Sequence, residues 1–282
     1  MTAHVTPRQT APAIWAGLTL DRPRVMAVLN VTPDSFSDGG RVDAATAIAA
    51  GLAMRAEGAD IVDVGGESTR PGAAPTPPDI ERARVLPVIR ALAAAGVLVS
   101  VDTRHAATMA AALDAGAAIV NDISGLTHDP DAAALVAARR CPVILMHMRG
   151  TPATMMALAR YDDVAAEVAA ELTVLIQAAG RAGIAHAAIA IDPGFGFAKH
   201  PPHSLALLRG LSALTALGFP IVAGVSRKGF IRATGGEPDP TRNFPGSIAA
   251  GLFALSQGAS VLRVHDVRET VQAVRVWHAL IG

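Results

Sequence analysis

The chain has 282 residues, 51% of them hydrophobic and only 4% aromatic, and its formal net charge is zero. α/β barrels routinely use this length for one domain, so we expect a flexible tail over residues 1–12 and a single domain over residues 13–282. A neutral chain offers no electrostatic footprint for nucleic acid or an anionic membrane surface. The one cysteine, Cys141, excludes an internal disulfide, and no stretch approaches the roughly 20 apolar residues of a membrane span. We therefore expect a cytoplasmic protein whose partners are small molecules.

Residues 13–23 predict a small hairpin, after which eight short apolar runs follow one another to the end of the chain. The runs are rich in Val, Ile, Leu, Met and Ala, as in parallel strands that are buried on both faces. They cover residues 25–30, 60–65, 97–102, 117–122, 142–147, 188–192, 220–225 and 260–265. Most of the segments between them are long enough for a helix. This alternation predicts a (β/α)8 TIM barrel with a short N-terminal hairpin or extension.

Helical spacing of apolar residues predicts helices between the strands, for example over residues 44–57, 78–95, 106–115, 163–182 and 247–257. Glycines 58, 96, 116, 183, 218 and 258 follow helical segments, where a glycine can take the left-handed backbone that ends a helix. Two connections are longer than a barrel needs. Residues 30–40 (NVTPDSFSDGG) follow the first strand and residues 65–78 (GGESTRPGAAPTPP) the second, and we expect both to be lid loops.

Each apolar run ends at or just before a polar residue that could take part in chemistry. In chain order these residues are Asn30, Asp63, Asp102, Asp122, His147, Asp192, Lys228 and His265. The carboxyl ends of parallel strands open on one face of a barrel, so we expect these side chains to converge there. Asp102, Asp192 and the neighbouring Asn121 could accept hydrogen bonds from a flat heterocycle with amino groups, since a buried carboxylate needs donors. The alternative for any one aspartate is that it only caps the following helix.

Three donors gather at the ends of the last two strands, namely Lys228, Arg263 and His265. This corner of a TIM barrel is frequently a phosphate site, although a solvated basic surface is the alternative. Asn30 and the polar residues after it offer oxygen ligands of the kind that Mg²⁺ prefers, a weak signal alone. His147 lacks the spacing of a metal-binding motif and is expected to be structural.

Together these segments resemble the dihydropteroate synthase family. The resemblance covers the chain from about Val25 to its end and rests on the motifs NVTPDSFSDGG, DVGGESTRPGA, SVDT, VNDISG, LMHMRGTPATM, DPGFGF, GVSRK and RVHDV. It implies a transferase of folate biosynthesis that joins 6-hydroxymethyl-7,8-dihydropterin diphosphate to 4-aminobenzoate, with Mg²⁺ as cofactor. It also implies a homodimer and competition by sulfonamide drugs at the aminobenzoate site.

The resemblance further implies a role for individual residues. The pterin and its diphosphate would be bound by Thr69, Asp102, Asn121, Ile123, Met146, Asp192, Phe197, Lys228, Arg263 and His265. Of these, Asp102, Lys228, Arg263 and His265 would act in catalysis. Phe36, Arg70 and Pro71 would form the aminobenzoate site beside Lys228, and Asn30 would hold the metal. Asp63, Asp122 and His147 are left as mainly structural residues.

Two positions depart from the family pattern. Gly229 stands where many members carry Ser or another side chain, and Ser204 stands where Asn is common. Two alternatives remain at this point, a pterin-dependent methyltransferase and a non-catalytic synthase-like paralogue. The methyltransferase would not need the two lid motifs, and a paralogue should have lost lid or phosphate residues.

Overall fold

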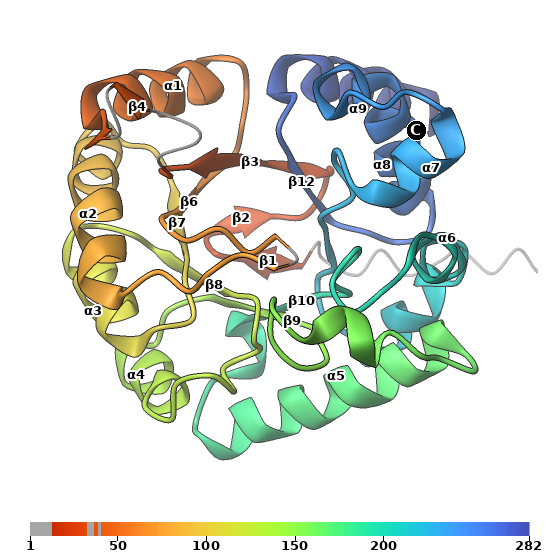
Figure 1. The fold of residues 1–282 in the computed structure, drawn as a ribbon, viewed down its shortest axis with the longest axis horizontal. Helices are drawn as coiled ribbons and strands as arrows, with labels where there is room; N and C mark the ends of the chain where they lie inside the picture. Colours follow the sequence, from red (N-terminus) through yellow and green to blue (C-terminus); the bar gives the residue numbers. More distant parts are fainter. Residues whose placement is uncertain (1–12, 33–36, 39–40, 71, 282) are drawn as a thin grey trace, which may run out of the picture.

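A computed structural model describes residues 13–32, 37–38, 41–70 and 72–281, and within them eight parallel strands form a barrel surrounded by helices (Figure 1). The strands are β3 (Arg24–Asn30), β6 (Ile61–Gly65), β7 (Val99–Asp102), β8 (Ile119–Asp122), β9 (Val143–Met146), β10 (Ile189–Asp192), β11 (Val222–Ala223) and β12 (Val261–Val264). They lie in the order β10-β9-β8-β7-β6-β3-β12-β11. A parallel bridge between Ile191 and Ile221 joins β10 to the chain before β11 and completes the ring. The predicted TIM barrel is confirmed.

Two shorter pairs of strands lie outside the barrel. β1 (Ile14–Trp15) and β2 (Leu18–Thr19) form the predicted N-terminal hairpin, and β4 (Ser37–Asp38) pairs with β5 (Arg41–Val42) beside the first long connection. The predicted tail, residues 1–12, lies outside the described residues.

The helices cover the outside of the barrel. They are α1 (Ala44–Ala56), α2 (Pro78–Ala94), α3 (Ala106–Asp114), α4 (Ala132–Arg139), α5 (Val164–Arg181), α6 (Pro201–Arg209), α7 (Gly229–Gly235), α8 (Phe244–Ser256) and α9 (Val267–Ile281), with short 3-10 helices at Met155–Leu158, His186–Ala188, Leu211–Leu217 and Pro240–Arg242. All six glycines that were predicted to end helical segments have positive φ angles. Helix α8 starts earlier than predicted, since Pro245 fits the first turn of a helix. Among the described helices, none combines the length and the apolar character needed to span a membrane.

Two apolar layers hold the barrel together. The larger lies between the strands and the helices. The smaller fills the interior of the barrel near the amino ends of the strands, which we call the lower interior. The residues of the smaller layer are Trp15, Met26, Ile61, Ile119, Ile144, Ala190, Val222 and Val261. Trp15 comes from the hairpin, and its indole Nε1 donates to the Ala188 carbonyl at 3.0 Å. The hairpin therefore closes the amino-terminal end of the barrel.

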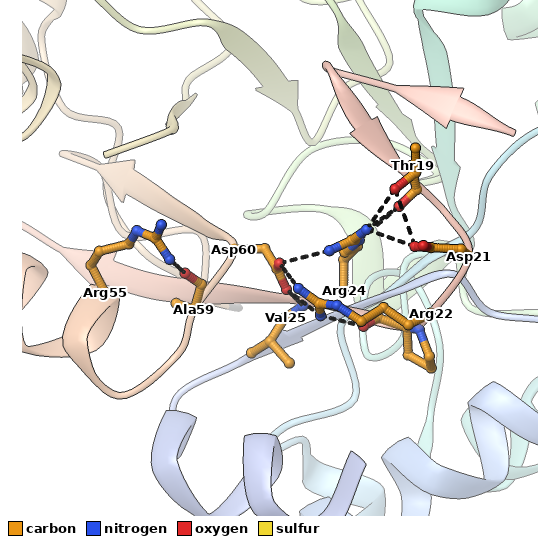
Figure 2. A network of polar contacts seen from close by, with 9 residues as sticks. Thr19, Asp21, Arg22, Arg24, Val25, Arg55, Ala59 and Asp60 are labelled. Atoms are coloured by element: carbon orange, nitrogen blue, oxygen red, sulfur yellow. Dashed lines mark hydrogen bonds and ion pairs between the residues drawn. The ribbon is translucent and has the colours of Figure 1, made fainter. Parts of the chain in front are cut away.

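A polar network fixes this hairpin to the first barrel strand (Figure 2). The buried Arg24 donates to the backbone carbonyl of Thr19 and forms ion pairs with Asp21 at 2.8 Å and Asp60 at 3.2 Å. Asp60 also pairs with Arg22 at 2.6 Å. Because a buried guanidinium is costly unless its N–H groups are satisfied, this network binds the floor of the barrel to the ends of β3 and β6.

Candidate functional site

A pocket lies at the carboxyl end of the barrel. Its lining residues are Thr69, Asp102, Asn121, Ile123, Met146, Asp192, Gly194, Phe195, Phe197, Gly224, Lys228 and Arg263. The lining thus includes every residue that was predicted to bind the pterin or its diphosphate, with the exception of His265. Sequence reasoning missed Gly194, Phe195 and Gly224.

The alternation of side chains along the strands explains why these residues meet. Successive side chains of a strand point to opposite faces, so residues two apart share a face. Several strands place an apolar residue in the lower interior and a pocket residue two positions later. The pairs are Ile119 and Asn121, Ile144 and Met146, Ala190 and Asp192, Val222 and Gly224, and Val261 and Arg263.

Arg263 is the centre of the polar contacts in this pocket. Its Nε donates to Asp63 Oδ2 and its Nη2 to Asp102 Oδ2, both at 2.7 Å. Asp63 Oδ2 also accepts from the Asn121 amide at 2.9 Å. The buried Asp63 therefore orients two residues of the pocket lining, a more specific position than the mainly structural role expected from sequence. The same alternation that places Ile61 inside the barrel would have placed Asp63 there too.

Burial controls the charge of the two aspartates that line the pocket. It raises the pKa of Asp102 to about 7, although the Arg263 guanidinium acts in the opposite direction. Burial also raises the pKa of Asp192, against a 2.7 Å hydrogen bond that its Oδ1 accepts from the Gly194 backbone N–H. Both carboxylates are poorly solvated, so a ligand that brings hydrogen-bond donors would replace the water they have lost.

Lys228 completes the pocket from the loop after β11. Its Nζ lies 4.2 Å from the centre of the Phe197 ring, and burial lowers its pKa to about 8 against the attraction of Asp192. The preceding Arg227 has a φ of 58° and pairs with Asp266 at 2.5 Å, while its backbone N–H donates to Ser247 Oγ at 3.0 Å. These contacts fix the loop that presents Lys228, since a left-handed non-glycine residue persists only where its surroundings hold it.

His265 lies two residues beyond Arg263 and does not line the pocket. Its ring Nδ1 is 3.1 Å from the Ser226 hydroxyl, which also accepts from the His265 backbone N–H at 3.2 Å. Burial, and then the charge of Arg263, lower the pKa of His265 to about 3. Both effects favour the neutral form of its imidazole.

The residues expected at the aminobenzoate site are only partly described. Arg70 is exposed, whereas Phe36 and Pro71 lie outside the described residues. The second long loop is anchored by the buried Glu67, whose Oε1 accepts from the Thr76 backbone N–H and from Arg104, both at 2.9 Å.

Asn30, the expected metal ligand, is half-buried at the end of β3 and pairs with Gly65 of β6. Another grouping, Glu67, Glu81 and His105, has ligand atoms within 4.8 Å of one another. Both carboxylate oxygens of Glu67 already bind Arg104, so a cation there would meet a positive charge, and none of the three residues lines the pocket. We therefore do not assign Mg²⁺ to this grouping.

The remaining polar strand ends have structural contacts. Asp122 accepts hydrogen bonds from Ser124 and from the Leu126 backbone within its own turn, and it does not cap the following helix, which begins only at Ala132. His147 lies between Glu171 and Lys199, as a hydrogen-bonded structural group would.

The fold and the pocket define a TIM-barrel enzyme that binds a small polar molecule at the carboxyl ends of its strands. Comparison with known proteins makes this more specific. The model of the pterin binding enzyme family matches residues 26–265. Dihydropteroate synthase from Mycobacterium leprae (strain TN) is 48% identical over 267 residues, which are 92% of this chain and 94% of that protein.

Two solved structures from Xanthomonas albilineans agree with this match. The dihydropteroate synthase solved with 4-aminobenzoic acid has a TM-score of 0.89 and 48% identity, covering 95% of this chain and 97% of that one. The structure with 7,8-dihydropteroate has a TM-score of 0.86 and 46% identity, covering 94% and 96%. The chain also spans 30% of the length of a probable bifunctional folylpolyglutamate synthase/dihydropteroate synthase from Haloferax volcanii, at 48% identity over 257 residues.

The chain therefore belongs to the pterin-binding enzymes, and within them to the dihydropteroate synthase family. This confirms the resemblance stated from the sequence motifs.

Proposed function

We propose that the chain condenses 6-hydroxymethyl-7,8-dihydropterin diphosphate with 4-aminobenzoate, giving 7,8-dihydropteroate and pyrophosphate. The observation that carries this proposal is the pocket in which Asp102, Asn121, Asp192, Lys228 and Arg263 meet. Relatives solved with 4-aminobenzoic acid and with 7,8-dihydropteroate support it.

The pterin ring binds in the deep part of the pocket. Its amino and ring N–H groups donate to Asp102 and Asp192, and the Asn121 amide serves both a donor and an acceptor on the ring edge. Apolar side chains of Ile123 and Met146 contact the flat faces of the ring. Specificity follows because a molecule without these donors would leave buried carboxylates unpaired.

The reaction breaks the bond between the pterin methylene carbon and the diphosphate oxygen. Negative charge grows on the leaving pyrophosphate, where Arg263, His265 and Thr69 stabilise it more in the transition state than in the ground state. Arg263 can do this while bound to Asp63, because its Nη1 protons are not used in the two carboxylate contacts. The pterin-methyl cation that remains is stabilised by the carboxylates of Asp102 and Asp192.

Mg²⁺ is the proposed cofactor, and the amide oxygen of Asn30 fits its preference for oxygen ligands at a strand end beside the pocket. When bound, the ion neutralises charge on the diphosphate oxygens.

The neutral amine of 4-aminobenzoate then attacks the methylene carbon, a C–N bond forms, and the amine loses a proton to solvent. No serine, cysteine or histidine nucleophile is needed. Phe36, Arg70 and Pro71 form the aminobenzoate site beside Lys228, and the two long loops exclude water from the cation. Sulfonamides compete there; a related synthase from Yersinia pestis has been solved with a sulfonamide drug complex.

The test is an assay of pyrophosphate release with and without 4-aminobenzoate and Mg²⁺. We expect release to depend on both. Release without 4-aminobenzoate would indicate a hydrolase, and no release under any condition would indicate a non-catalytic paralogue. Lys228→Ala and Arg263→Ala should each abolish turnover while circular dichroism shows an intact barrel, and normal activity in both variants would contradict the site assignment.

We further propose a homodimer in the cytoplasm. Helices α8 and α9 lie side by side on the outside of the barrel (Figure 1), and their exposed apolar residues include Phe244, Phe253, Val276 and Leu280. Exposed apolar side chains on adjoining helices are typical of an interface between copies. The single cysteine, Cys141, is a buried free thiol, which suits a reducing compartment.

A further inference from the structure

Lys199 is a buried cation to which the proposed reaction gives no role. It is one of only two lysines in the chain, the other being Lys228, and only 2% of its surface is exposed. Its Nζ lies 2.8 Å from His147 Nδ1, 3.1 Å from the Gly194 carbonyl and 3.0 Å from the Phe197 carbonyl. Three acceptors match the N–H groups of an ammonium ion, so the contacts suit the charged form of the side chain.

Two of these acceptors belong to the loop that forms one wall of the pocket. Gly194, Phe195 and Phe197 all line the pocket. The loop has an unfavourable backbone, with positive φ at Gly194 (69°), Gly196 (77°) and Ala198 (49°). For the alanine this conformation is strained. The surrounding contacts must hold the loop in this shape, and the Lys199 ammonium joins both ends of it.

The third acceptor fixes the loop to the neighbouring strand. A Cβ added at Gly194 would lie 2.0 Å from the His147 carbonyl oxygen, so the loop backbone packs directly on the chain after β9. The His147 ring is held at its far side, where Nε2 lies 3.0 Å from Glu171 Oε2. Glu171 in turn accepts from Arg149 Nε at 3.0 Å.

These contacts decide which nitrogen of His147 carries its proton. Nε2 donates to the Glu171 carboxylate, which leaves Nδ1 as an acceptor for Lys199. Burial, and then the charge of Lys199, lower the pKa of His147 to about 4, in agreement with a neutral ring. The network therefore runs from the surface carboxylate through His147 and Lys199 to two carbonyls of the pocket wall.

We propose that Lys199 is a positioning residue, whose contacts with His147 Nδ1 and with the Gly194 and Phe197 carbonyls hold the loop that forms the pterin side of the pocket. Lys199 itself does not line the pocket and does not touch the reacting atoms. This inference rests on the proposed assignment of the pocket to the pterin.

The test compares Michaelis constants for the two substrates in Lys199→Met. We expect the KM for the dihydropterin diphosphate to rise by at least about tenfold, the size expected when charged hydrogen bonds are lost. The KM for 4-aminobenzoate should change by less than about twofold, because that substrate approaches from the lid loops. Arg209→Met is the matched control. It removes an exposed positive charge from the helix that follows the same loop, and both constants should stay at their original values.

Two His147 variants keep the proposal testable if Lys199→Met does not fold. Asparagine can place an amide oxygen near the position of Nδ1, whereas leucine offers no acceptor. His147→Asn should therefore keep the KM for the pterin substrate within about threefold. His147→Leu should raise it beyond that, but less than Lys199→Met does, because Lys199 keeps its contacts with the Gly194 and Phe197 carbonyls. Combining His147→Leu with Lys199→Met should add little to the effect of Lys199→Met alone, because Lys199→Met has already broken the contact with His147.

Asp192→Asn separates this proposal from the site assignment. If Asp192→Asn raises the pterin KM and Lys199→Met does not, the positioning role is wrong and the pocket assignment stands. If neither variant raises it, the pocket assignment is wrong and the proposal falls with it. Two other results would overturn the proposal. One is that Lys199→Met loses thermal stability and changes both KM values equally. The other is that the two His147 variants have the same KM for the pterin substrate.

Discussion

The buried carboxylate of Asp102 should lower the free energy of unfolding at neutral pH. Replacing Asp102 with asparagine should therefore stabilise the folded protein. Its folded pKa is raised from 3.8 to about 7, mainly by burial. A raised pKa means that the folded protein holds the proton more tightly than the unfolded chain. The stability that the protonated Asp102 contributes is fully present below pH 3.8, and it is lost as the pH rises through about 7.

The shift sets the magnitude of the effect. A difference of about 3 pKa units corresponds to about 4 kcal/mol in the free energy of unfolding above pH 7. At pH 5 the folded carboxyl is neutral but the unfolded one is still ionised, so about 2 kcal/mol of the cost remains. Asp102→Asn keeps the shape of the side chain and an oxygen for Arg263, and removes the charge. We expect the variant to be more stable than the original protein, with a larger gain at pH 8 than at pH 5.

Urea unfolding at the two pH values measures this difference, and Asp114→Asn is a matched control. Asp114 is exposed and its pKa is lowered by Arg139, so its replacement should give no gain at pH 8. Turnover of Asp102→Asn should fall by at least about tenfold, since its carboxylate is proposed to bind the pterin. A variant that is less stable at pH 8, or a gain that is the same at both pH values, would refute the reasoning.

Three further changes test other parts of the molecule. Asp63→Asn should lower kcat/KM for the pterin substrate by about tenfold, because Arg263 and Asn121 share its Oδ2; unchanged steady-state kinetics would show that neither needs this carboxylate. Trp15→Ala should lower the free energy of unfolding by about 3–5 kcal/mol and leave both KM values unchanged, as checked by urea denaturation and the same assay. Phe253→Lys should convert the proposed dimer to a monomer in sedimentation experiments, and a variant that still sediments as a dimer would place the interface elsewhere.

The positions of the strands could be predicted from the sequence, but the direction of their side chains could not. Buried parallel strands are apolar on both faces, so the sequence pattern does not show which residues point inward. Asp63 and Asp122 therefore looked alike. In the structure Asp63 shares the inner face with Ile61 and bonds to Arg263, whereas Asp122 bonds within its own turn.

The pocket residues were predicted from motifs of the family, and the contacts between them were not. Lys199 shows the reason. Its position depends on a loop whose backbone is left-handed at Gly194 and Gly196, and on a histidine 52 positions away in the sequence. Neither apolar periodicity nor turn composition encodes such a contact. The contact between the His265 ring and the Ser226 hydroxyl is a second example that the sequence did not predict.

The hairpin at the amino-terminal end of the barrel also affects the order in which substrates bind in the pocket at the other end. Among the described residues, Trp15 and the inner apolar layer fill the amino-terminal end of the barrel, which leaves the mouth at the carboxyl ends of the strands as the way into the pocket. The pterin substrate, which occupies the deep pocket, therefore has to arrive before anything that binds above it. The sealed floor thus predicts an ordered kinetic scheme, in which 4-aminobenzoate binds only after the pterin substrate.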